Sequence, residues 1–257
     1  MAKPQSKTLE PRDLPARPAF RERQVVRDLR FCALVGRTAW AGLPNLGQER
    51  FSKRPTSGNS AIYQGQITEC RINSAGWLLA RLGLAIGAPL PLHRDTGVPA
   101  VVTITEDLAT GGQFWTRVYG RSRGFPQVIH SIKRFSGPTG LEEYLGYGFG
   151  IALAITADTR ALHFHADHYF LCIGRLRWRL PRLLAPGALT ISHVDHGDGW
   201  FAFILTLRHP RFGELVHQVG MFQDRTEIAS RPTTDARPTA RISGDRTPVA
   251  DTTDIEP

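Results

Sequence analysis

The sequence WFAFILTLR, residues 200–208, carries the clearest strand pattern in the chain. Every second residue in it is large and apolar: Phe201, Phe203, Leu205 and Leu207. Successive side chains of a β-strand point to opposite faces, so this spacing predicts a strand with one apolar face. Turn sequences precede it at residues 197–199 and follow it at residues 210–213, which predicts hairpin connections on both sides.

Similar short runs fill the chain from Pro99 to Phe222 and are separated by turn sequences every 8–14 residues. Strands at this spacing are typical of sandwiches and barrels. We therefore predict a mainly β (α+β) fold, in which about ten antiparallel strands form a curved sheet or a barrel-like meander. Residues 62–72 add an earlier strand. Whether the sheet closes is left open by the pattern.

One or two helices are expected on the N-terminal side of these strands. Apolar spacing predicts one helix over residues 24–40, followed by a polar loop over residues 45–60. A second helix is predicted over residues 75–86, with Ser74 as its N-cap. It is apolar nearly all round, and such a helix is normally buried, although it could also be a lid over an apolar ligand.

Composition divides the chain into three parts. Residues 1–24 are rich in proline and charge and are predicted to be a disordered arm, while residues 225–257 contain almost no core residues and are predicted to be a disordered tail. Residues 25–224 form the single predicted domain. Residues 1–60 hold 12 Lys and Arg against 5 Asp and Glu, so much of the net charge of +9 lies before the strands. We do not expect nucleic-acid binding, because no recognition motif accompanies the charge.

The predicted location is the cytoplasm. The start of the chain lacks the apolar core of a secretory signal, and the longest apolar stretch, residues 75–92, is too interrupted to span a membrane. The three cysteines are far apart and lack CxxC spacing, which is typical of reduced thiols in a cytosolic protein.

Two glycine motifs are better explained by turns than by chemistry. Residues 120–124, GRSRG, match the G-x-S-x-G string of hydrolases, but a strand-like sequence follows where a helix is required. Residues 146–150, GYGFG, lack the following helix of a dinucleotide loop and are predicted to be a bend or bulge in a strand.

Histidines form the densest group of metal-ligand side chains. His163 and His165 share one face of a predicted strand, and His193 lies on a later strand, each with an aspartate nearby in the sequence. Imidazole and carboxylate groups suit zinc or iron. A solvated strand face explains the same residues without a metal, so these are weak candidates.

A polar and aromatic set is the best candidate for a binding site. Trp115, Arg117 and Tyr119 project from one face of a predicted strand, and Lys133 lies on the next one. These four residues could form the polar mouth of a pocket for an anionic head group, or an ion-pair array on the outer surface. Glu142 and Glu143 are adjacent and should point opposite ways, so they are not expected to form a catalytic pair.

The run from Gly112 to Leu153, and the later segments around Leu180–Pro186 and residues 188–222, resemble the bacterial domain of unknown function 4166 (DUF4166) family. The most specific parts are the Trp-x-Arg strand before Gly120, the run FSGP at residues 135–138, and residues 180–186. The resemblance spans about residues 30–224. It implies a domain without an established activity and without catalytic residues to carry over. The resemblance also implies that some members of the family are fused to NAD(P)-binding modules. We find no such module in this sequence, so any oxidoreductase role would have to be supplied by a partner in trans.

The sequence therefore favours non-catalytic binding of an apolar or lipid-like small molecule, in a domain that could be accessory to an oxidoreductase. No cofactor is predicted. The alternative is a metal-dependent enzyme that uses His163, His165 and His193.

Overall fold

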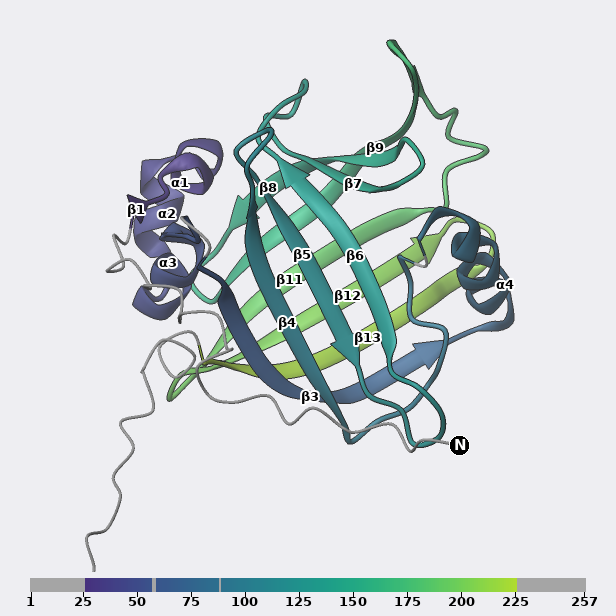
Figure 1. The fold of residues 1–257 in the computed structure, drawn as a ribbon, viewed down its shortest axis with the longest axis horizontal. Helices are drawn as coiled ribbons and strands as arrows, with labels where there is room; N and C mark the ends of the chain where they lie inside the picture. Colours follow the sequence, from purple (N-terminus) through teal and green to yellow (C-terminus); the bar gives the residue numbers. More distant parts are fainter. Residues whose placement is uncertain (1–25, 57–58, 88, 226–257) are drawn as a thin grey trace, which may run out of the picture.

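Ten antiparallel strands close into a barrel in the computed structural model, which describes residues 26–56, 59–87 and 89–225 (Figure 1). The strands of the barrel are β3 (Ala61–Ile72), β4 (Val98–Asp107), β5 (Gly112–Tyr119), β6 (Gln127–Arg134), β7 (Glu142–Gly146), β8 (Phe149–Ala157), β9 (Ala161–Ile173), β11 (Ala188–Gly197), β12 (Trp200–His209) and β13 (Gly213–Asp224). The predicted fold class is confirmed, and the sheet that the sequence left open is closed.

Closure occurs where the last strand meets the first. The barrel strands follow one another around the ring in chain order from β3 to β13, and the antiparallel pairing of β13 with β3 completes the ring. Only the first part of β9 pairs with β11, from Ala161 to His165. Its last part pairs instead with the short strand β10 (Leu176–Arg179), so the β9–β10 hairpin extends away from the barrel. The strands β9 and β11 therefore separate at one end of the barrel.

Alternation along the strands sorts the side chains into an interior and an exterior. In β12 the four apolar residues of the predicted stripe are buried inside the barrel: Phe201, Phe203, Leu205 and Leu207. The turns at residues 120–124 and 146–150 connect hairpins, and a register shift near Gly146 marks the predicted bulge.

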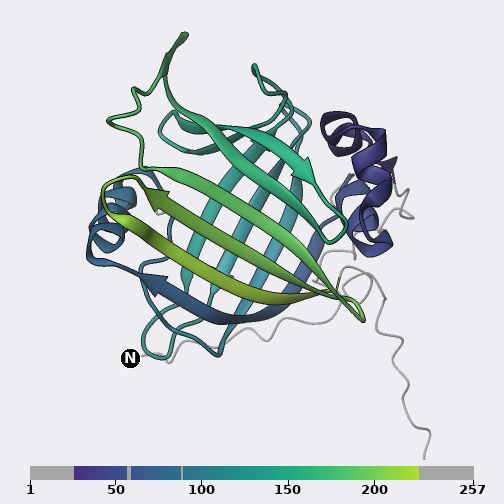
Figure 2. The same cartoon turned by 180° about the vertical axis from the view of Figure 1, so that it is seen from behind.

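Short helices cover one end of the barrel (Figures 1 and 2): α1 (Arg30–Val35), α2 (Arg37–Gly42) and α3 (Asn45–Ser52), flanked by β1 (Val26–Arg27) and β2 (Lys53–Arg54). The single helix predicted over residues 24–40 is wrong, because Gly36 adopts φ 90° and interrupts it. The loop predicted over residues 45–60 is also wrong in its first half. Helix α3 is mostly polar, and it is held by Phe51, which is buried against Phe31.

Helix α4 (Ser74–Leu82) and the 3₁₀ helix η2 (Gly83–Ile86) lie at the other end of the barrel. Asn73, rather than Ser74, is the N-cap, and its side-chain oxygen accepts a hydrogen bond from the Gly76 amide at 2.8 Å. The expectation that this helix is buried is wrong. Its apolar residues Leu78, Leu82 and Leu84 are exposed, because one side of the helix faces away from the barrel.

In the part of the chain that is described, none of the helices combines the length and the apolar character needed to cross a lipid bilayer. The predicted arm, residues 1–24, and the predicted tail after Arg225 lie outside the described residues.

Candidate functional site

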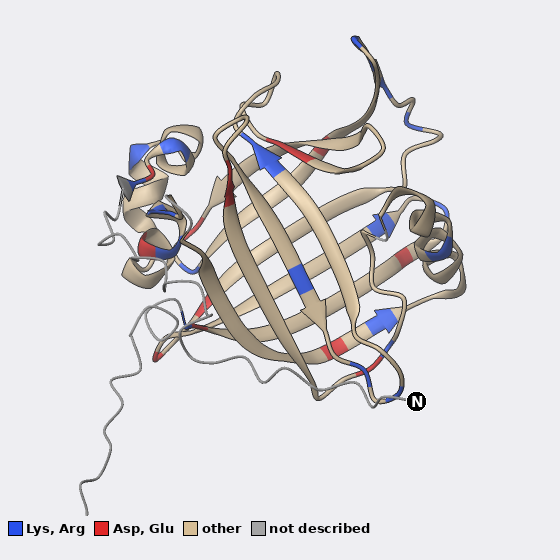
Figure 3. Ribbon diagram, in the orientation of Figure 1, with Lys and Arg blue, Asp and Glu red and all other residues tan. Residues whose placement is uncertain are grey.

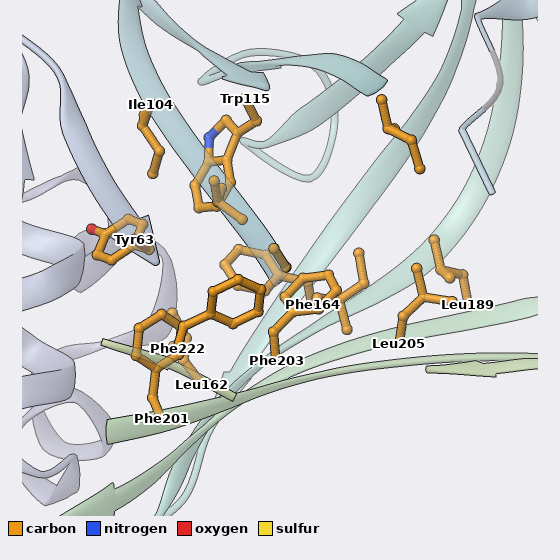
Figure 4. Close-up of a cluster of buried hydrophobic side chains, with 14 of the residues drawn as sticks. Tyr63, Ile104, Trp115, Leu162, Phe164, Leu189, Phe201, Phe203, Leu205 and Phe222 are labelled. Atoms are coloured by element: carbon orange, nitrogen blue, oxygen red, sulfur yellow. The ribbon is translucent and has the colours of Figure 1, made fainter. Parts of the chain in front are cut away.

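A cavity of about 280 Å³ occupies the half of the barrel beneath α4 and η2. Its walls are apolar side chains from β6, β8, β11 and β12 and from the two helical segments α4 and η2. These side chains are Leu79, Ile86, Ile129, Ile151, Leu189, Ile191, Phe203, Leu205 and Leu207. Figure 4 shows part of this wall, with Leu189 and Leu205 beside the aromatic residues that fill the other half of the barrel. Small-molecule pockets of roughly 300–1,000 Å³ are typical, so the cavity is just below that range.

The mouth of the cavity lies between α4 and the segment that follows β10. Leu82 and Leu184 line the cavity and are also 65% and 69% exposed, so they form its rim. Leu180, Pro186 and Pro89 complete the outer part of the lining. The separation of β9 from β11 leaves room for this opening.

Charged side chains form the inner end of the cavity. Arg117 of β5 donates hydrogen bonds to Ser131 Oγ (3.0 Å) and to Glu143 Oε1 (3.3 Å). Lys133 Nζ donates to Glu143 Oε2 at 2.7 Å from the side away from the cavity. All four residues are buried, and Arg117, Ser131 and Glu143 line the cavity.

The electrostatics of this inner end favour a negative group. Burial opposes ionisation of Glu143, but the charges of Lys133 and Arg117 and the hydrogen bonds from Lys133 and Ser131 lower its pKa to about 2. Burial lowers the pKa of Lys133, and the carboxylate of Glu143 opposes that shift. With all three groups ionised, two positive charges lie beside one negative charge. The cluster therefore carries one positive charge in excess.

The four predicted ligand-binding residues all point into the barrel. Arg117 and Tyr119 line the cavity, whereas Trp115 and Lys133 lie deeper, with Lys133 Nζ 4.8 Å from the centre of the Trp115 ring. They lie at the inner end of the cavity rather than at its mouth. The alternative of an ion-pair array on the outer surface is wrong, because all four side chains are buried.

Glu142 and Glu143 point to opposite faces of β7, as predicted. Glu143 faces the interior, whereas Glu142 forms an ion pair with Arg177 of β10 at 2.6 Å and accepts a hydrogen bond from the Tyr144 hydroxyl at 3.0 Å. The prediction correctly separated the two carboxylates, but it missed Glu143 as a partner of Arg117.

The three candidate metal ligands do not come together. The rings of His163 and His165 are 6.0 Å apart and bond to residues such as Ser192 and Thr156 on the outer face. His193 points into the barrel interior, where it is surrounded by aromatic rings. Within the described ranges, no group of three or more His, Cys, Asp or Glu side chains could hold a metal ion.

Sequence reasoning missed Ser131 and Arg50. Ser131 could have been found, because it lies two residues before Lys133 and must share its face of the strand. Arg50 could not, because only the packing of α3 against the barrel places its guanidinium 3.5 Å from the centre of the Phe201 ring.

The fold and the site define a class of protein: a closed antiparallel barrel with an apolar interior cavity that ends at buried charges. The sequence profile of a family described as "Domain of unknown function (DUF4166)" matches residues 43–222. The chain belongs to this family, as its sequence motifs indicated. No curated protein matches the chain. No solved structure matches it either.

Proposed function

We propose that the protein binds an apolar or lipid-like small molecule inside the barrel without catalysing a reaction on it, and that the polar end of this molecule carries a negative charge. One observation carries the proposal: the apolar cavity opens to the surface at one end and meets Arg117, Ser131 and Glu143 at the other. Pockets for small molecules commonly combine apolar walls with a few fixed polar groups.

The excess positive charge supports the acidic head group. A carboxylate near Arg117 would balance the charge of the cluster, and the planar guanidinium suits a carboxylate. The chain of such a ligand would lie along Leu189, Leu205 and Leu207 and point toward the mouth. Burial of each methylene group contributes about 0.8 kcal/mol, so a medium-length chain provides most of the affinity.

The test compares three ligands with the same medium-length alkyl chain: a carboxylic acid, an alcohol and an amine. We expect calorimetric affinities to fall in that order, since the amine would add a third positive charge. The Arg117→Met variant should lose the preference for the acid and keep the affinity for the alcohol. Glu143 remains paired with Lys133 and Ser131 in this variant, so we expect it to fold.

A cavity-filling variant provides a second test of the proposed function. Leu205→Trp should weaken all three ligands, because the larger ring occupies the space of the chain. Ile204→Val, on the outer face of the same strand, is the matched control. Equal affinity for the three head groups in the wild type would contradict the acidic ligand, and no binding of any of them would contradict the proposal as a whole.

We also propose that the protein works in a reducing compartment, such as the cytoplasm. Support comes from Cys32, Cys70 and Cys172, which are all unpaired. Fractionation of cells that produce the protein tests this, and recovery outside the cytoplasm would contradict it.

A further inference from the structure

The surface around the mouth of the cavity is both apolar and basic. Leu78 and Leu82 are exposed on one side of α4, and Trp178, Leu183 and Leu184 are exposed on β10 and the segment after it. We call these five residues the mouth surface. Soluble proteins rarely expose contiguous apolar patches larger than a few hundred Å², and such patches mark interaction sites.

The chain segments that carry the mouth surface contain no acidic residue. Residues 74–94 and 168–190 hold six arginines and no Asp or Glu. Arg81, Arg175, Arg179 and Arg182 are exposed, and Figure 3 shows basic residues in blue along the hairpin that extends from β9. Arg177 pairs with Glu142, and Arg179 lies 3.9 Å from Asp167, but neither Arg175 nor Arg182 has an ion pair with a described residue. The surface therefore presents leucine and tryptophan side chains among unneutralised positive charges.

We propose that the mouth surface docks on an anionic lipid membrane, so that the ligand moves between bilayer and cavity without crossing water. Basic side chains are attracted to acidic lipid head groups, and tryptophan and leucine insert at the boundary with the acyl chains. Leu82 and Leu184 belong both to the cavity lining and to the mouth surface, so docking would join the apolar interior to the bilayer. This inference rests on the proposed function, and it adds the source of the ligand.

Charge and position favour a membrane over a protein or nucleic acid. Nucleic acid would pair with the arginines but would not bury an aliphatic side chain such as Leu183, which is 79% exposed. A protein partner could bury such side chains, but it would cover the mouth and block exchange of a ligand. An anionic bilayer attracts the arginines, buries the apolar side chains and keeps the mouth of the cavity in contact with lipid.

Co-sedimentation of the full chain with vesicles tests the proposal. One set contains a mixture of phosphatidylglycerol and phosphatidylcholine, and the other contains phosphatidylcholine alone. We expect binding to the anionic vesicles that weakens with added salt, and little binding to the neutral ones. The Arg175→Gln/Arg182→Gln variant should bind the anionic vesicles roughly 25-fold more weakly, since each basic side chain contributes about a factor of five.

The apolar part is tested by the Trp178→Ser/Leu183→Ser variant, which should also bind the anionic vesicles less. Neither residue lines the cavity, so its affinity for the free carboxylic acid should be unchanged. The control is Leu108→Ser, which removes a residue that is 85% exposed near α1, at the opposite end of the barrel. Equal vesicle binding by Trp178→Ser/Leu183→Ser and by Leu108→Ser would overturn the proposal. Wild-type protein that does not bind anionic vesicles at low salt would also overturn it. Failure of the proposed function would appear separately, as wild-type protein that does not bind the free acid.

Discussion

Glu143 is a carboxylate held between two buried cations. Its two oxygens accept hydrogen bonds from Ser131, Arg117 and Lys133. Breaking a buried ion pair by removing one partner is costly, because the remaining charges lose their compensation. Glu143 therefore holds the inner end of the cavity together as well as shaping its charge.

We expect Glu143→Gln to destabilise the protein by about 3–5 kcal/mol, because it leaves Arg117 and Lys133 buried without an anion. Lys133→Met should cost less, since Glu143 keeps Arg117 and Ser131. Urea denaturation measures both. A Glu143→Gln variant as stable as the wild type would show that the cluster does not act as a buried ion pair.

The same carboxylate predicts acid sensitivity. Its pKa is lowered in the folded state to about 2, so its contribution to stability is present above the ordinary pKa of 4.5 and is lost as the pH falls from 4.5 toward 2. The wild type should lose stability through this window more steeply than Glu143→Gln. Equal slopes for the two proteins in thermal melts would contradict the assignment.

His193 provides a second pH effect. Burial, and then the charges of Arg50, Lys133 and Arg117, lower its pKa well below 6.5. The unfolded chain therefore binds a proton below pH 6.5 that the folded protein does not, and stability falls as the pH falls below 6.5. His193→Phe should remove up to about 1.4 kcal/mol per pH unit of this slope. His165→Gln, on the outer face, should change it less, and parallel pH curves for wild type and His193→Phe would refute the effect.

At this scale the sequence predicted which side chains share a face of a strand, but few of their partners. Alternation placed Trp115, Arg117 and Tyr119 on one face and separated Glu142 from Glu143. It could not say which face was inside, since polar residues on a strand normally face water. The register that brings Lys133 opposite Glu143 depends on the hairpin between β6 and β7.

Among the elements, α4 and the segment that follows β10 flank the mouth of the cavity. An apolar helix that covers an opening looks like a buried helix in sequence, because both lack a polar face. The sequence therefore predicted the existence of α4 but could not decide between a buried helix and a lid. At the other end, α3 was not predicted for the opposite reason: it is mostly polar, and its buried residues are Gly47, Arg50 and Phe51.

Gly76 fixes how closely α4 approaches the barrel. A Cβ atom at this position would overlap the carbonyl oxygen of Leu215 in β13. Gly76→Ala should therefore displace α4, and we expect faster hydrogen exchange over residues 74–86 and faster release of the ligand. Gly47→Ala in α3 is the control, because a Cβ there meets nothing within 4 Å. Unchanged exchange in Gly76→Ala would contradict this role of α4.

For the whole molecule, the decisive feature is that the sheet closes while its two ends differ. One end is filled by aromatic residues and covered by α1–α3, and the other holds the cavity. The strand pattern predicted the number and type of strands. Closure depends on twist and on the pairing of the last strand, β13, with the first, β3, and neither is visible in residue alternation.

The most direct test is diffraction from crystals grown with a medium-chain carboxylic acid that carries bromine at its far end. We expect an anomalous bromine signal inside the barrel near Leu82 and Leu184, with the carboxylate at Arg117. An empty barrel, or bromine only on the outer surface, would contradict the claim that the interior is a binding site for an acidic, apolar ligand.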